Sequence, residues 1–146
     1  MSATGEKFLA GTVVRTGVLR IRLRAPCRPT ESPAKVKLAV LNLFPDARFA
    51  REEGEIEAES SSFDRLRDRI RAQKIRDSAR HALRAGVDGH RIRFALNKQA
   101  AYVGRVNFGA NSPLGDIVVD LEIEDPEALI DAIAESTTRP PPTPLG

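Results

Sequence analysis

Apolar and charged residues alternate along three segments of the chain, and this alternation limits the fold more than any other feature. A period of two places neighbouring side chains on opposite faces of a strand. Each segment therefore predicts a strand with one buried and one solvated face, in a sheet that helices cover on one side only. The first segment has Leu19, Ile21 and Leu23 on one face and Arg20, Arg22 and Arg24 on the other, and the others run through 91–96 and 117–124.

A helix is predicted after the first strand. Ser32 is a suitable N-cap and Pro33 suits the first helical position. Apolar residues then recur at helical spacing until Pro45 ends the helix. Two short strands, 47–51 and 55–59, are predicted to follow it and to be joined by a glycine turn.

A second, arginine-rich helical stretch begins after three consecutive serines. Phe63, Leu66 and Ile70 keep helical spacing, but the next apolar residue, Ile75, is five positions further on. Five positions rotate the apolar stripe by about 140°. We therefore expect a bend, or two consecutive helices, near Gln73.

The remainder of the chain is predicted to add three strands and a helix. The strands cover 92–96, 102–108 and 117–123, and the polar segment 97–101 separates the first two. An Asp-Pro pair at 125–126 is typical of a helix start.

This order of elements predicts an α+β fold: a two-layer sandwich with a mostly antiparallel sheet and helices packed on one face. The chain of 146 residues has the length of one domain. We expect a flexible lead-in over 1–16, a single domain over 17–137 and a disordered, proline-rich tail over 138–146. The apolar runs are too short to span a membrane and the first ten residues do not resemble a signal peptide, which predicts a cytoplasmic protein with no membrane partner.

Charge is distributed unevenly along the chain. The net charge is +2 over residues 1–61, +8 over 62–108 and −7 over 109–146, which gives +3 in total. A strongly basic stretch attracts polyanions, and arginine pairs well with phosphate. Two explanations stay open here, an RNA partner or pairing of the acidic third with the basic centre across a homodimer.

The arginine-rich helix and the Asn-Lys-Gln segment are the candidate RNA-binding elements. Several cations of the helix can face one phosphate backbone, although a solvated surface explains any single arginine as well. The Asn-Lys-Gln segment offers amide groups and a cation, although turn chemistry explains it equally. The candidate residues are Arg69, Gln73, Arg76, Arg80, Asn97, Lys98, Gln99, Arg105 and Ser112.

The sequence contains no catalytic or metal-binding pattern. Cys27 is the single cysteine, and neither His81 nor His90 has the spacing of a zinc ligand. A phosphate-binding glycine loop and a nucleophile elbow are also absent. We therefore expect no enzymatic activity, no cofactor and no metal ion.

Five motifs occur in the order that characterises one protein family. They are PTESP at 29–33, VLNLFP at 40–45, QKIRDSAR at 73–80, NKQAAYVG at 97–104 and SPLG at 112–115. From roughly Val18 to Thr138, the chain resembles the archaeal uncharacterised protein family 0201. The resemblance implies RNA binding, a tendency to form dimers, and a two-layer α+β fold similar to that of large-subunit ribosomal protein five.

We therefore predict a non-catalytic RNA-binding protein of archaeal type. A basic surface with few aromatic residues suits structured RNA better than single strands, and ribosomal and transfer RNA are candidates. The alternative is a homodimeric protein-interaction or small-ligand module with no nucleic-acid role.

Overall fold

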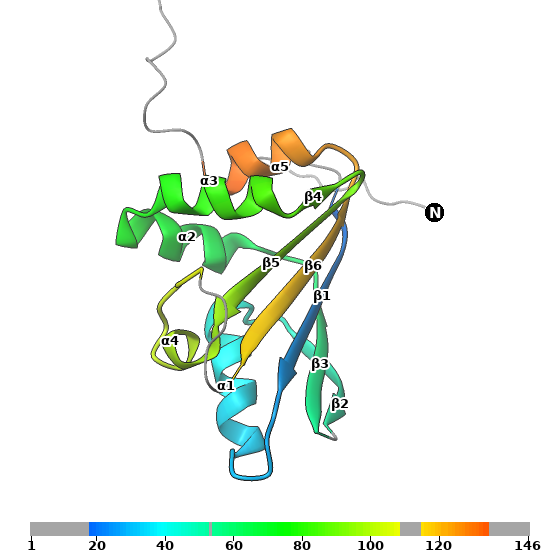
Figure 1. The fold of residues 1–146 in the computed structure, drawn as a ribbon, viewed down its shortest axis with the longest axis vertical. Coiled ribbons are helices and arrows are strands. Elements are labelled where there is room, and N and C mark those ends of the chain that lie inside the picture. Colours follow the sequence, from blue (N-terminus) through cyan, green and yellow to red (C-terminus); the bar gives the residue numbers. More distant parts are fainter. Residues whose placement is uncertain (1–17, 53, 109–114, 135–146) are drawn as a thin grey trace, which may run out of the picture.

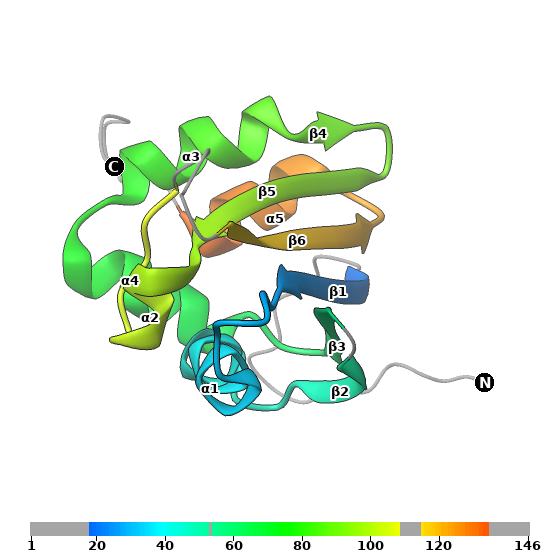
Figure 2. The same cartoon turned by 60° about the horizontal axis from the view of Figure 1, so that its bottom comes forward.

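The computed structural model describes residues 18–52, 54–108 and 115–134, which form a six-stranded antiparallel sheet with the helices on one side (Figures 1 and 2). The strands are β1 (Val18–Pro26), β2 (Arg48–Glu52), β3 (Glu55–Ser60), β4 (Val87–Asp88), β5 (Arg91–Asn97) and β6 (Asp116–Ile123). The helices are α1 (Pro33–Leu43), α2 (Asp64–Gln73), α3 (Arg76–Ala85), α4 (Lys98–Tyr102) and α5 (Pro126–Ile133). The order across the sheet is β2-β3-β1-β6-β5-β4.

The alternating segments form the strands predicted for them. Ile21 of β1 lies opposite Leu121 of β6, and Leu23 lies opposite Val119. All four side chains are buried, whereas Arg22 on the other face of β1 is exposed. The sheet therefore has one apolar face under the helices and one charged face without a covering layer.

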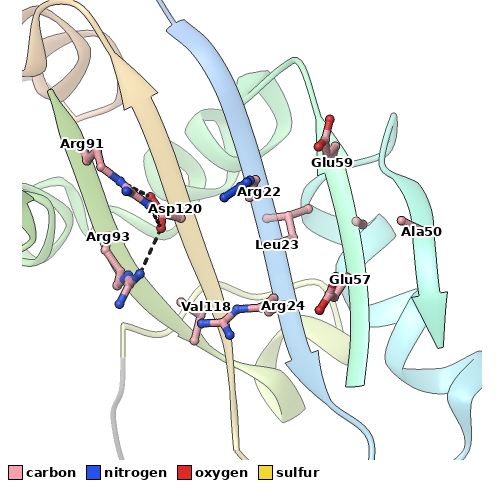
Figure 3. Close-up of a pocket in the computed structure, with 11 residues that line it drawn as sticks. Arg22, Leu23, Arg24, Ala50, Glu57, Glu59, Arg91, Arg93, Val118 and Asp120 are labelled. Atoms are coloured by element: carbon pink, nitrogen blue, oxygen red, sulfur yellow. Dashed lines mark hydrogen bonds and ion pairs between the residues drawn. The ribbon is translucent and has the colours of Figure 1, made fainter. Parts of the chain in front are cut away.

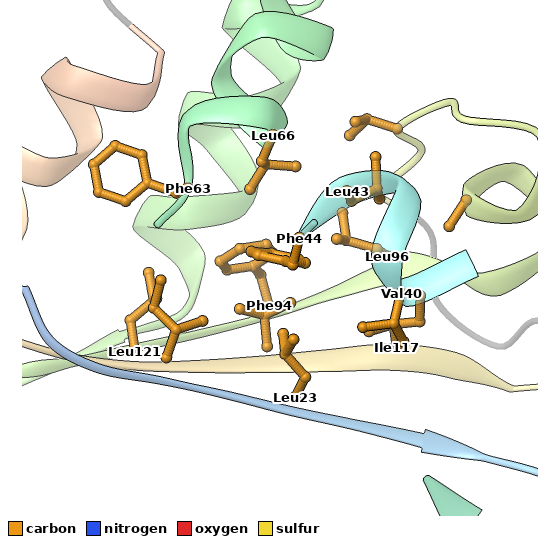
Figure 4. Packing of buried hydrophobic residues seen from close by; sticks show 14 of the residues in the cluster. Leu23, Val40, Leu43, Phe44, Phe63, Leu66, Phe94, Leu96, Ile117 and Leu121 are labelled. Atoms are coloured by element: carbon orange, nitrogen blue, oxygen red, sulfur yellow. The ribbon is translucent and has the colours of Figure 1, made fainter. Parts of the chain in front are cut away.

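The hydrophobic core lies between the sheet and the helices (Figure 4). Phe44 after α1, Leu66 of α2 and Phe94 of β5 are among its buried side chains. Burying a side chain of this size contributes about 2 kcal/mol. Packing of the helices on the apolar face is thus a main source of stability.

The break in the arginine-rich stretch is confirmed, because α2 and α3 are two consecutive helices. Lys74 between them has a φ of 60°, in the left-handed region. The backbone N–H of Lys74 donates to the Arg71 carbonyl oxygen at 3.1 Å, and the N–H of Ile75 donates to the Ile70 carbonyl oxygen at 3.2 Å. This pair of bonds ends α2 and lets both Ile70 and Ile75 reach the core.

The prediction of a strand over 102–108 is wrong. Residues 98–102 form the short helix α4, because the Asn97 side chain caps it by accepting a hydrogen bond from the Ala100 N–H at 2.8 Å. Gly104, with a φ of +79°, then turns the chain. Residues 105–108 have no regular structure, and the Gln73 side chain bonds Val106 in place of a neighbouring strand.

The predicted fold class is confirmed in its layers and in the antiparallel sheet. The likeness to large-subunit ribosomal protein five stays a prediction. The predicted lead-in 1–16 and tail 138–146 lie outside the described residues. Within the described ranges, every helix is too short or too polar to span a bilayer.

Candidate nucleic-acid interface

The open face of the sheet carries alternating columns of opposite charge (Figure 3). A shallow hollow of about 420 Å³ lies over these columns. Arg91 and Arg93 lie 2.6 and 3.1 Å from Asp120, and Arg20 lies 3.0 Å from Glu59. Because positive and negative side chains alternate on this face, it gives a polyanion little net attraction.

Asp120 joins two of the arginines on this face. Burial raises the pKa of its carboxyl, but hydrogen bonds from Arg91 and Arg93, together with their charges, outweigh burial and hold the pKa below its ordinary value of 3.8. The carboxylate is therefore ionised at neutral pH. A phosphate group would have to break an ion pair to reach either arginine.

The acidic C-terminal third neutralises part of the basic centre within the same chain. Arg80 of α3 lies 2.7 Å from Asp131 and donates a second hydrogen bond, of 3.0 Å, to the Ala134 carbonyl oxygen. One turn further along α3, Arg84 lies 2.8 Å from Glu127 of α5. The side chain of Arg80 is only 17% exposed. It holds α5 against α3 and has few donors left for a ligand.

Gln73 also has a structural role in this arrangement. Its Nε2 donates to the Val106 carbonyl oxygen at 2.9 Å, and its Oε1 accepts from the Val106 N–H at 2.7 Å. Both groups of the amide are thus engaged with the backbone. Gln73 fixes the irregular segment 105–108 against the junction of α2 and α3.

The Asn-Lys-Gln segment places its three side chains in different environments. Asn97 caps α4, while Lys98 is 4% exposed. The Lys98 Nζ donates to the Pro26 carbonyl oxygen at 2.6 Å and lies 2.9 Å from Glu31. Gln99, in contrast, is exposed. A phosphate group on the surface could reach Gln99 but not the Lys98 ammonium.

Three exposed cations remain around the junction of α2 and α3, and we call Arg69, Lys74 and Arg105 the elbow cluster. The Arg69 Nη2 lies 4.0 Å from the point where a side chain on Gly104 would begin. Arg105 and Lys74 are the chain neighbours of Val106 and Gln73, which bond each other. In the described part of the chain, none of the three cations makes an ion pair.

The other two candidates are placed differently. Arg76 is half-buried and interacts with other groups of the chain. Ser112 lies outside the described residues. No group of three or more histidine, cysteine or carboxylate side chains within the described ranges could hold a metal ion.

Sequence reasoning did not select Lys74 as a candidate, although a signal for it was present. The change of phase between Ile70 and Ile75 marks the point where the chain turns, and Lys74 occupies that turn. The partnership of Lys98 with Glu31 had no such signal. The two residues are 67 positions apart, and no periodicity connects them.

The chain is similar to several known proteins. A family model described as RNA binding matches residues 20–124. The UPF0201 protein of Metallosphaera sedula is 40% identical over 129 residues, which cover 82% of this chain and 90% of that protein. The UPF0201 protein MJ1564 of Methanocaldococcus jannaschii is 36% identical over 126 residues, which cover 83% of this chain and 74% of that protein.

Similarity extends to the three-dimensional structure. The crystal structure of a UPF0201 protein from Methanococcus jannaschii matches with a TM-score of 0.78 and 39% identity, over 82% of this chain and 96% of that one. These matches agree with the family that the five sequence motifs predict. The chain therefore belongs to the UPF0201 family of archaeal proteins, whose matching family model is described as RNA binding.

Proposed function

We propose that this protein binds RNA without catalysing a reaction, and that the elbow cluster holds the phosphate backbone. The observation that supports this most is the exposure of Arg69, Lys74 and Arg105 without an ion pair in the described residues. Cations that are not already paired gain the most from phosphate contact, because they lose no existing partner. The match to the RNA-binding family model favours the same function.

Structured RNA fits this surface better than an extended single strand. The three cations come from α2, from the turn between α2 and α3, and from an irregular segment, so they surround a junction and do not follow a groove. Aromatic residues make up 5% of the chain, too few for the row of stacking platforms that single-strand binders use. Recognition of backbone shape needs only positioned cations. Ribosomal and transfer RNA both present such a backbone.

Replacing Arg69, Lys74 and Arg105 together with glutamine should weaken binding of a transfer RNA roughly 30-fold at low salt. The slope of the logarithm of affinity against the logarithm of salt concentration should become less steep by about 2 to 3, since each of the three lost phosphate contacts contributes about 0.7 to 0.9 to it. Fluorescence anisotropy at several salt concentrations measures both. The three side chains are exposed, so the melting temperature should stay close to that of the wild type.

A matched control is available on the open sheet face. Replacing Arg20, Arg24 and Arg91 with glutamine removes the same net charge, but from side chains that are ion-paired within the chain. This variant should lose much less affinity. Equal losses in the two variants would show that net charge alone attracts RNA and would remove the elbow cluster as a site.

A second candidate function is homodimerisation through the open sheet face, which the order of its charge columns favours. From β3 through β1 and β6 to β5, the outward columns are acidic, basic, acidic and basic. A half-turn about an axis parallel to the strands, between β1 and β6, would place every column over one of opposite charge. Two-fold interfaces require this self-complementarity. Arg22, which has no ion pair in the described residues, would then face the Asp120 column.

The dimer is tested by measuring the mass of the protein in solution. Wild-type protein should sediment as a dimer at low salt, and Arg22→Glu should sediment as a monomer, because the new carboxylate would face another carboxylate. Arg28→Glu is the control, since Arg28 is exposed and lies outside the strands. A wild-type protein that stays monomeric at all soluble concentrations would exclude this interface.

A further inference from the structure

A groove of about 480 Å³ lies between the start of α1 and the helix α4. This volume falls within the range of small-molecule sites in proteins. None of the three cations of the elbow cluster lines it. The residues that line it are Thr30, Glu31, Ser32, Lys35, Val36, Ala39, Lys98, Gln99 and Tyr102. Six of them belong to the PTESP and NKQAAYVG motifs, which the elbow cluster leaves unexplained.

The groove is held in shape by contacts on both sides. The Asn42 side chain of α1 donates to the carbonyl oxygens of Ala101 and Tyr102, each at 3.0 Å, and so fixes the end of α4. The buried ion pair between Lys98 and Glu31 joins α4 to the segment before α1. These contacts fix α4 relative to α1 and to the segment before it, which gives the groove a defined shape.

Apolar and polar groups are arranged in the groove as in a site for a planar ring. Val36 and Ala39 are buried and contribute an apolar floor. The Tyr102 side chain is 39% exposed, and the Lys35 ammonium lies 5.9 Å from the centre of its ring. Gln99 and Thr30 are exposed at the rim and offer an amide and a hydroxyl group.

Tyr102 differs from the other aromatic residues of the described ranges. Phe44, Phe63 and Phe94 are buried, and Phe49 and Phe108 are half-buried against the core. Among the aromatic residues that the structure describes, Tyr102 is the most exposed, and Lys35 lies beside its ring; the half-buried Phe49 also has a lysine, Lys37, 5.2 Å from its ring centre. An exposed ring next to a cation suits a nucleobase and its phosphate, because bases stack on aromatic side chains and phosphates pair with ammonium groups.

The groove adjoins the elbow cluster. Arg105 follows Tyr102 closely in the chain, and its backbone N–H donates to the carbonyl oxygen of Ala100 in α4 at 2.9 Å. Tyr102 is the last residue of α4 and Arg105 lies three positions beyond it, so the exposed ring and the exposed arginine lie near the same end of this helix. A nucleic-acid strand that contacts Arg105 would have its next nucleotides within reach of Tyr102.

We propose that the groove between α1 and α4 binds one unstacked nucleobase of the RNA. The Tyr102 ring is the stacking platform, Gln99 and Thr30 hydrogen-bond the base edge, and Lys35 pairs with the adjoining phosphate. This inference rests on the proposed RNA function and adds to it the recognition of an unpaired base, in a loop or a bulge. It explains why two of the sequence motifs meet here.

The experiment compares two RNAs of equal length and charge, a hairpin with a single-stranded loop and a fully paired duplex. Tyr102→Leu should weaken binding of the hairpin about tenfold and leave binding of the duplex unchanged. Its salt dependence should equal that of the wild type, because no charge is lost. Tyr102→Phe should retain the affinity. The control is Leu38→Ser, which alters an exposed apolar side chain that belongs to α1 and lies outside the groove.

A fluorescent base analogue in the loop reports the stacking directly. Its emission should be quenched on binding to the wild type and to Tyr102→Phe, but not on binding to Tyr102→Leu. If the wild type binds the hairpin and Tyr102→Leu binds it with the same affinity, base binding in the groove is overturned but the proposed RNA function is not. A wild type that binds neither RNA overturns the proposed function as well. Displacement of the analogue by polyglutamate of equal charge would assign the groove to an acidic peptide and overturn base recognition.

Discussion

Replacing Lys98 with methionine is expected to lower the free energy of unfolding by about 3 kcal/mol, because removal of one partner leaves a buried charge unpaired. The Lys98 side chain is 4% exposed, and its partner Glu31 is 13% exposed. The variant would also leave the Pro26 carbonyl oxygen without its 2.6 Å hydrogen bond. Chemical denaturation monitored by circular dichroism measures the loss.

A double variant separates the charge from the packing. Glu31→Gln removes the unpaired carboxylate, so Lys98→Met with Glu31→Gln should be more stable than Lys98→Met alone. If the double variant is no more stable, the loss comes from the shape of the methionine side chain. An unfolding free energy within 0.5 kcal/mol of the wild type in Lys98→Met would exclude a stabilising ion pair.

The pH dependence of stability gives an independent measurement of the same pair. Burial raises the pKa of the Glu31 carboxyl, but hydrogen bonds from the Arg28 N–H and from Lys98, with the lysine charge, outweigh burial and lower the pKa below its ordinary value of 4.5. Such a group stabilises the fold fully above its unfolded pKa, and the contribution is lost as the pH falls through the folded pKa. Lys98→Met should show a weaker dependence in this acidic range.

The fold could be predicted where the local pattern and the tertiary structure agree. Ile21 and Leu23 alternate with arginines because one face of β1 is buried, and that face is visible from spacing alone. The change of phase before Ile75 likewise gave the break between α2 and α3. In both cases, burial acts on residues that are close in the sequence.

Prediction failed where a distant side chain replaces a backbone partner. Residues 102–108 have apolar and polar residues in a strand-like order, but the N–H and carbonyl groups of Val106 are bonded by Gln73, 33 positions away. Phe108 packs against Phe94, with 5.9 Å between ring centres, in an irregular segment. Local propensity contains no information about either contact.

The sequence identifies candidate cations, but it does not show which of them stay exposed. Lys98 and Arg80 have the residue types of phosphate ligands, yet one is buried on Glu31 and the other is paired with Asp131. Partners that are far apart in the sequence decide which cations stay exposed. Arg69 and Arg105 remain exposed because no carboxylate of the fold is brought to them in the described residues.

Gly86→Ala is expected to lower the free energy of unfolding by about 3 kcal/mol or more, because there is no space for a methyl group. A Cβ at Gly86 would lie only 1.7 Å from the Arg93 carbonyl oxygen, which belongs to the backbone of β5. Gly86 ends α3, and its own carbonyl oxygen accepts from the Arg93 N–H at 3.0 Å. Relief of the clash would require α3 and β5 to separate and would break this bond.

Gly89 provides the matched control for that prediction, because it is limited by conformation and not by space. Its φ is +62°, and a Cβ there would meet no atom within 4 Å. Gly89→Ala should therefore cost only about 1 kcal/mol, the strain of a left-handed alanine. Thermal and chemical denaturation of both variants measure the difference. Equal losses in the two variants would mean that the close approach of α3 to β5 does not require glycine at position 86. A much larger loss in Gly86→Ala would show that this close approach positions α3, and with it the neighbouring elbow cluster, on the sheet.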